Sequence, residues 1–165
     1  MPAPHSPPLL ACFPPVIDDQ TEILILGSFP GEASLQVQQY YAHPRNQFWR
    51  LLSAVLNDDL LTLPYQNRLA RLQAHRIGLW DVIGACEREG SLDSAIRNAR
   101  ANNFQMLKTR CPALRRVAFN GKTAGRHAAS FAEAGFQTIV LPSSSPAHAA
   151  MSYEKKLAAW RSVLH

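Results

Sequence analysis

The sequence has little that points to a secreted, membrane-embedded or metal-clustered protein. Its three cysteines, Cys12, Cys86 and Cys111, lie far apart, and it has no Cys-x-x-Cys pair. Zinc ribbons and four-cysteine iron–sulfur sites are therefore disfavoured, and we expect reduced thiols in the cytoplasm. No apolar run approaches the roughly 20 residues of a membrane span. Residues 1–15 are rich in proline and lack the basic region and apolar helix of a secretory signal. No HExxH or other metal-ligand spacing occurs, so we predict neither a metal nor a cofactor.

Lysine is also scarce, because Lys108, Lys122, Lys155 and Lys156 are the only lysines among 17 basic residues. Arginine supplies the rest, and with 12 acidic residues the net charge is +5. Guanidinium groups match phosphate geometry, and cationic proteins release counterions from DNA. Since many basic proteins bind no nucleic acid, the charge indicates a polyanionic partner without establishing one.

The length and composition suit one domain. The chain has 165 residues, of which 47% are hydrophobic, enough to build a substantial core. We predict a Pro-rich N-terminal arm over residues 1–15 and a single domain over residues 16–165.

Short apolar runs alternate with helical patterns along this domain. Strands are predicted over residues 22–27, 77–83, 116–120 and 137–141, and helices over residues 47–57, 65–75, 104–109, 121–134 and 153–164. The alternation predicts an α/β fold, a three-layer α/β/α sandwich around a central, mainly parallel four-stranded sheet. In such sheets ligands bind beyond the carboxyl ends of the strands. We therefore expect a site where the loops that begin at Gly27, Asn120 and Pro142 converge.

Two loop segments carry residues suited to a ligand. Gly27-Ser-Phe-Pro-Gly31 is a stiff turn whose glycines permit close approach. It lacks GxGxxG and the Walker lysine, so a nucleotide site is disfavoured, and a structural turn is the alternative. Tyr40–Trp49 combines aromatic rings, a His-Pro turn and an amide at a helix start. A helix cap is the alternative role of Asn46, and we expect Phe48 and Trp49 to fill the core.

Five segments carry a resemblance to a known family: Ile25-Leu-Gly-Ser-Phe-Pro-Gly31, Tyr40-Tyr-Ala-His-Pro-Arg-Asn-Gln-Phe-Trp49, Gly90-Ser-Leu-Asp-Ser-Ala-Ile96, Phe119-Asn-Gly121 and Leu141-Pro-Ser-Ser-Ser-Pro-Ala147. Together they resemble the uracil-DNA glycosylase superfamily and, within it, the hypoxanthine-DNA glycosylase (DNA-deoxyinosine glycosylase) family. The resemblance spans nearly the whole chain after about Phe13. It implies the three-layer fold, a DNA substrate with a deaminated base, and hydrolysis of the N-glycosidic bond of deoxyinosine, which releases hypoxanthine and leaves an abasic site.

The resemblance also implies roles for individual residues. Other members of the superfamily carry Asn or Asp inside the first glycine-rich turn, where this chain has Ser28 and Phe29, and the catalytic role moves to Asn46. Tyr41 would stack on the flipped base, and Asn120 would hydrogen-bond its edge. From the residues themselves we expect the turn residues Gly27, Ser28 and Phe29 to contact the base. We likewise expect DNA contacts from Ser143, Ser144, Ser145, Pro146, His148 and Lys122. A solvated surface charge is the alternative for Lys122.

The chemistry agrees with these roles. A base in duplex DNA must be extruded, at a cost of a few kcal/mol, and stacking returns about 1–3 kcal/mol. An amide offers the donor and the acceptor that suit the edge of hypoxanthine. Asn46 is too weak a base to take a proton, so we expect it to orient the attacking water through its amide oxygen. Glu32, the nearest carboxylate in these loops, is expected to be a solvated charge. No lysine lies in the proposed catalytic loops, which disfavours Schiff-base chemistry and predicts a monofunctional enzyme.

Three alternatives remain open at this stage. The same fold could remove uracil, thymine or xanthine, although the missing Asn or Asp in Gly27–Gly31 argues against this. A catalytically silent nucleic-acid-binding module and a small-molecule hydrolase are the others. We expect a monomer that acts on DNA, has no contact with a membrane, and lies in the cytoplasm in association with the nucleoid.

Overall fold

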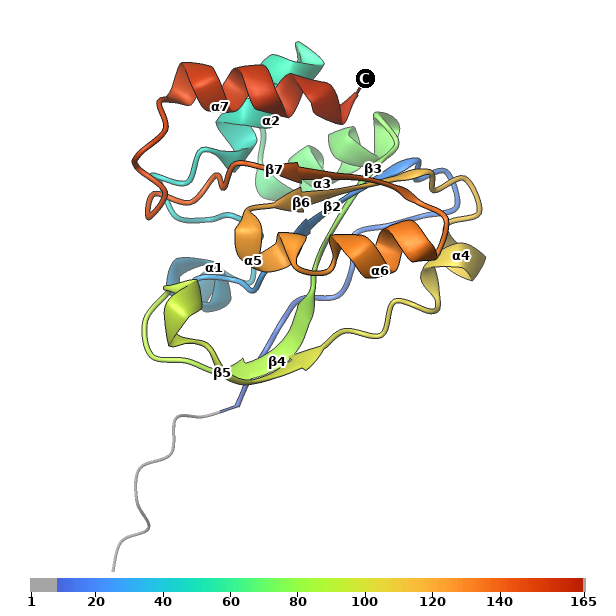
Figure 1. The fold of residues 1–165 in the computed structure, drawn as a ribbon. Coiled ribbons are helices and arrows are strands. Elements are labelled where there is room, and N and C mark those ends of the chain that lie inside the picture. The colour runs from blue at the N-terminus through green and yellow to red at the C-terminus, as the bar shows by residue number, and fades with distance from the viewer. Residues whose placement is uncertain (1–8, 165) are drawn as a thin grey trace, which may run out of the picture.

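A four-stranded parallel sheet runs through the middle of the protein in a computed structural model that describes residues 9–164 (Figure 1). Its strands are β2 (Ile23–Gly27), β3 (Ile77–Asp81), β6 (Arg116–Asn120) and β7 (Gln137–Leu141). They lie in the order β3-β2-β6-β7, and every neighbouring pair is parallel. The predicted parallel sheet is confirmed, and the structure adds the strand order.

Helices cover both faces of this sheet (Figure 1). The helices on one face are α2 (Phe48–Leu56), α3 (Tyr65–Ala74) and α7 (Tyr153–Trp160), and those on the other are α4 (Leu107–Arg110), α5 (Lys122–Gly125) and α6 (Ala128–Glu133). Side chains of β2 alternate between the two layers. Ile23 and Ile25 belong to the core under α2, α3 and α7, whereas Leu24 and Leu26 belong to the core under α4, α5 and α6. Because both faces are covered, the whole strand is buried, and the predicted three-layer α/β/α arrangement is confirmed.

The strand predicted over residues 77–83 is wrong in its extent, because it belongs to two sheets. After Asp81 the chain leaves the parallel sheet and continues as β4 (Ile83–Glu87) in a small antiparallel sheet, whose other strands are β1 (Leu10–Ala11) and β5 (Arg97–Ala101). The chain changes sheets where β2 ends, at Val82, whose N–H donates a hydrogen bond to the carbonyl oxygen of Gly27 (2.8 Å). The residues that follow form β4, which pairs with β1 and β5.

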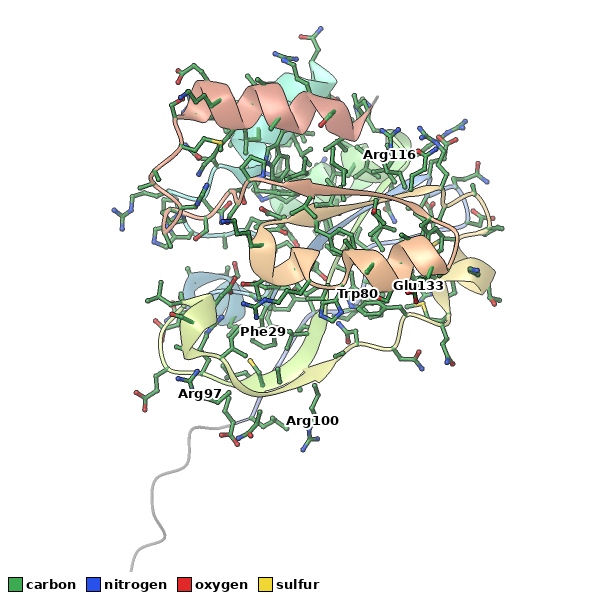
Figure 2. All side chains as sticks on the ribbon, in the orientation of Figure 1. Phe29, Trp80, Arg97, Arg100, Arg116 and Glu133 are labelled. Carbon is green, nitrogen blue, oxygen red and sulfur yellow. The ribbon has the colours of Figure 1, made fainter. Side chains whose placement is uncertain are left out.

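Strand β5 has no counterpart among the sequence predictions. All five of its residues are exposed, so it lacks the apolar alternation from which a strand is predicted. Arg97 and Arg100 point outward from this strand (Figure 2).

Residues 1–8 of the predicted N-terminal arm lie outside the described residues, and the later part of the arm packs on the domain. Phe13 is buried and meets the ring of Tyr40 edge-on, with 5.1 Å between centroids. Val16 forms an antiparallel bridge with Leu79. The division of the chain at residue 15 stays a prediction.

The predicted helices differ from the observed ones mainly at their ends. The helix predicted over residues 121–134 is two short helices, α5 and α6, and the one over residues 153–164 is α7 followed by a 3₁₀ turn, η2 (Arg161–Val163). Helix α1 (Glu32–Val37) lies in a segment predicted as a loop, and a 3₁₀ turn, η1 (Asp93–Ala95), follows β4. Within residues 9–164, no helix has the length and apolar character needed to cross a bilayer.

Candidate active site

A cavity of about 290 Å³ lies at the carboxyl edge of the parallel sheet. Strand register brings Gly27 beside Asp81, and Asn120 ends the next strand at the same edge. The cavity is lined by these strand ends, the loop before α2, the segment before η1 and the loop after β7. Its volume is at the low end of the roughly 300–1,000 Å³ of small-ligand sites, which suits a ligand the size of a nucleobase. The predicted convergence of the three loops is confirmed.

All but one of the residues predicted for the site line this cavity. They are Gly27, Ser28, Phe29, Tyr41, Asn46, Asn120, Ser143, Ser144, Ser145, Pro146 and His148. Lys122 is not among the lining residues and is exposed at the first position of α5.

The side chain of Asn46 both lines the cavity and supports the start of α2. The side-chain Oδ1 accepts a hydrogen bond from the backbone N–H of Phe48 (3.0 Å), and the backbone N–H of Asn46 donates to the carbonyl oxygen of His43 (3.0 Å). An amide oxygen has two lone pairs, so one remains for a water molecule in the cavity. Gln47, and not Asn46, is the N-cap of α2, so Asn46 supports the helix from the position before the cap, which is geometrically compatible with the predicted catalytic role.

Tyr41 is held with one face of its ring against the core. It stacks on Phe48 with 3.8 Å between centroids and an interplanar angle of 17°. Its φ of 55° lies in the left-handed region, which is rare for a bulky residue and costs on the order of 1 kcal/mol. The Oη atom is buried with no partner among the described residues. Burial, followed by the charge of Asp81, raises the pKa of this hydroxyl well above its ordinary value, and the nearby Asn120 side chain acts in the opposite direction, so Tyr41 presents a neutral hydroxyl.

The amide of Asn120 is paired with Ser144 across the cavity wall. Its Nδ2 donates to Ser144 Oγ (2.9 Å), and the Ser144 N–H donates to its Oδ1 (2.9 Å). Each end of the amide keeps one unused position for a ligand. Ser144 is fully buried, so a DNA contact from Ser144 would require this pair to open. Gly121, which follows Asn120, has a φ of 99° and so turns the chain from β6 into α5 at little cost.

The loop after β7 is held by local hydrogen bonds and by a buried lysine. Ser143 Oγ accepts from the N–H of Ser145 (3.1 Å), and Ser145 Oγ accepts from the N–H of Ala147 (3.2 Å). The ammonium group of Lys156 donates to the carbonyl oxygen of His148 (2.7 Å) although Lys156 is only 2% exposed. Burial lowers the pKa of this lysine. These contacts order the loop before any ligand binds.

The Gly27–Gly31 turn is held through its carbonyl groups. Pro30 accepts a hydrogen bond from the buried guanidinium of Arg88 (2.6 Å), which also lies 5.3 Å from the centroid of the Phe29 ring. The Ser28 hydroxyl donates to Asp93 (2.8 Å). Because these contacts use carbonyl oxygens and a side chain, they leave the N–H groups of the turn as candidate donors to a ligand.

Asp81, which the sequence predictions did not include, lies inside this cavity and is 3% exposed. Burial, followed by the nearby charge of Asp93, raises the pKa of Asp81 from 3.8 to about 7. Its Oδ2 has no hydrogen-bond partner among residues 9–164. Glu32, the carboxylate that the sequence did bring forward, is exposed as expected. The sequence feature that could have identified Asp81 is its place as a carboxylate at the end of an apolar strand. Asn120 has the equivalent place at the end of β6.

Comparison with known proteins gives consistent results. The sequence profile of the Uracil DNA glycosylase superfamily matches residues 14–164. The chain is 49% identical over 136 residues to a hypoxanthine DNA glycosylase of Methanosarcina barkeri, covering 82% of this chain and 86% of the relative. It is 44% identical over 151 residues to a hypoxanthine DNA glycosylase of Methanosarcina acetivorans, covering 92% and 95% respectively. The solution NMR structure of a candidate uracil DNA glycosylase from Methanosarcina acetivorans superposes with a TM-score of 0.84 at 42% identity, over 95% of this chain and 99% of that one.

Proposed function

Because this chain belongs to the uracil DNA glycosylase superfamily, we propose that it is a DNA-repair glycosylase that releases hypoxanthine from deoxyinosine. The observation that carries this proposal is its similarity, over most of its length, to two hypoxanthine DNA glycosylases. The cavity supports it, since an aromatic ring and two amides line a space suited to one base. The reaction is hydrolysis of the N-glycosidic bond, and the product DNA carries an abasic site.

The base reaches the cavity by leaving the duplex. Extrusion costs a few kcal/mol. Stacking of the base on the Tyr41 ring, which lines the cavity and is itself stacked on Phe48, returns part of this cost. The free N–H and the free lone pair of Asn120 then pair with the edge of the base. Ser144 holds the Asn120 amide in one orientation, so little side-chain entropy is lost when the base binds.

Hydrolysis uses a water molecule that Asn46 orients through the remaining lone pair of its amide oxygen. The sugar acquires positive charge as the base departs, so correct placement of a weak nucleophile suffices. The N–H groups of the Gly27–Gly31 turn stabilise negative charge on the departing base. Ser143, Ser145, Pro146 and His148 contact the DNA backbone from the loop after β7, and Lys122 contributes a charge nearby. Action as a monomer and association with the nucleoid remain predictions.

Base release from defined duplexes tests this function. Duplexes with one deoxyinosine, one deoxyuridine or one G·T mismatch are incubated with the protein and then treated with alkali, which cleaves at abasic sites. We expect cleavage chiefly at deoxyinosine, with an unmodified duplex and the Asn46→Ala variant as controls. Cleavage chiefly at deoxyuridine would assign this chain the activity for which its NMR neighbour is described. Salt-sensitive binding without any cleavage would leave a silent DNA-binding module.

A further inference from the structure

The mechanism above leaves unused polar groups in the cavity. Within residues 9–164, six buried side-chain polar atoms have no hydrogen-bond partner, and three of them belong to residues that line this cavity: Tyr41 Oη, Asp81 Oδ2 and His148 Nε2. Buried polar groups are nearly always paired in folded proteins. These three groups are therefore available to a ligand that enters the cavity.

The fold brings the carboxyl group of Asp81 close to the hydroxyl of Tyr41. Asp81 ends β3 in register with Gly27 on β2. A Cβ placed on Gly27 would lie 2.7 Å from Asp81 Oδ1 and also 2.7 Å from Tyr41 Oη. Both polar atoms therefore occupy the space that a side chain at Gly27 would fill, and both face the same small region of the cavity.

The surroundings of Asp81 favour its neutral form. The titratable groups around it are Cys12, Tyr40, Tyr41 and Asp93. The charge of Asp81 raises the pKa of the first three, and the charge of Asp93 raises the pKa of Asp81. His43 and His148 line the same cavity. No salt bridge of the described residues includes Asp81, and the Asn102 amide donates to its backbone oxygen instead of to its carboxylate. A carboxyl group without a cation or a donor keeps its proton more readily than one in water.

We propose that Asp81, in its protonated form, donates a hydrogen bond to the base in the cavity and transfers that proton to the base as the N-glycosidic bond breaks. This inference rests on the proposed glycosylase function and adds a general acid to it. A protonated carboxyl can donate to O6 or N7 of hypoxanthine, both of which gain negative charge when the base departs. An ionised carboxylate at the same place would repel that charge.

Breakage of the N-glycosidic bond is coupled to proton transfer from Asp81. The bond between C1′ of the sugar and N9 of the base breaks, and both electrons stay on the base. The proton of Asp81 moves to an acceptor atom of the base, which leaves as neutral hypoxanthine. The oxygen of water bonds to C1′, and the proton lost by the water passes to solvent. Asp81 regains a proton from solvent after the base has left.

Single-turnover cleavage of a deoxyinosine duplex, measured from about pH 5.5 to about pH 9, tests the proposal. We expect the wild-type rate to fall roughly tenfold per pH unit above the pKa of Asp81, and Asp81→Asn to be about 100-fold slower or more at low pH, with no such decline. Asp93→Asn should move the decline to lower pH, since Asp93 raises the pKa of Asp81. Glu133→Gln is the matched control, a carboxylate-to-amide change on an exposed position of α6 (Figure 2).

Other outcomes would overturn the proposal. A wild-type rate that rises with pH would exclude a general acid, and loss of that rise in Asp81→Asn would make Asp81 a general base. An Asp81→Asn variant with an unchanged rate, or with a uniform loss and the wild-type pH profile, would reduce Asp81 to a structural group. Binding of each variant to a duplex with an abasic site shows whether the variant is folded, and Asp81→Ala provides a second variant if Asp81→Asn fails this check. A wild-type protein that releases no hypoxanthine would overturn the proposed function as well, whereas normal cleavage by Asp81→Asn would overturn only the role of Asp81.

Discussion

Replacement of Asp81 by Asn should change how the stability of the protein depends on pH. Folding raises the pKa of this carboxyl from 3.8 to about 7. The folded protein therefore holds the proton more tightly than the unfolded chain does. Asp81 contributes its full stability below the unfolded pKa, and this contribution is lost as pH rises through the folded pKa. A difference of about three pH units corresponds to about 4 kcal/mol at most, of which about 2–3 kcal/mol falls between about pH 5 and about pH 8.

Urea denaturation followed by tryptophan fluorescence can measure this difference at the two pH values. The asparagine side chain has nearly the same shape and does not titrate. The free energy of unfolding of Asp81→Asn minus that of the wild type should therefore increase by about 2–3 kcal/mol from about pH 5 to about pH 8. Groups that titrate in both proteins, such as Asp58 beside His75 and Arg71, cancel in this difference. A difference that stays constant within about 0.5 kcal/mol would show that Asp81 titrates normally and would refute the reasoning.

Three further predictions concern the cavity. Asn46→Ala should lower the single-turnover rate far more than DNA affinity, because water orientation matters chiefly in the transition state. Equal losses would leave Asn46 only its hydrogen bond to Phe48 at the start of α2. Tyr41→Phe should retain capture of the flipped base and Tyr41→Ala should weaken it, as measured by the substrate concentration at half-maximal single-turnover rate; equal failure of both would show that the hydroxyl matters. Gly27→Ala should lower the rate of cleavage at least about tenfold, because its Cβ would displace Asp81 and Tyr41. Urea denaturation should show a loss of stability of about 1–3 kcal/mol. Unchanged cleavage would show that the two side chains can move without consequence.

Local sequence patterns were sufficient to predict the parallel sheet. A strand covered on both faces must be apolar throughout, so Ile23–Leu26 and Val117–Phe119 stand out from the polar segments around them. Loops that follow parallel strands meet at one edge, which is why Gly27, Asn120 and the Ser143–Pro146 segment were expected together. The motifs also indicated the family, which the comparisons confirm.

Other features depend on contacts between distant segments. The strand order and the antiparallel sheet are pairings that no local pattern specifies, and the exposed residues of β5 resemble a loop. The pairing of Asn120 with Ser144 joins residues 24 positions apart. The apolar run through Trp80 and Ile83 predicted one strand, because periodicity alone cannot show where a chain leaves one sheet for another.

The sequence by itself therefore determined the fold class, the family and most of the residues around the cavity. Only the tertiary structure decided the state of Asp81. In the sequence Asp81 is an ordinary aspartate at the end of an apolar run, and its ordinary pKa would leave it ionised at neutral pH. Its burial, the space left by Gly27 and the charge of Asp93 come from separate parts of the chain. A pKa depends on the solvent and charges around a group in space, and only folding assembles that environment.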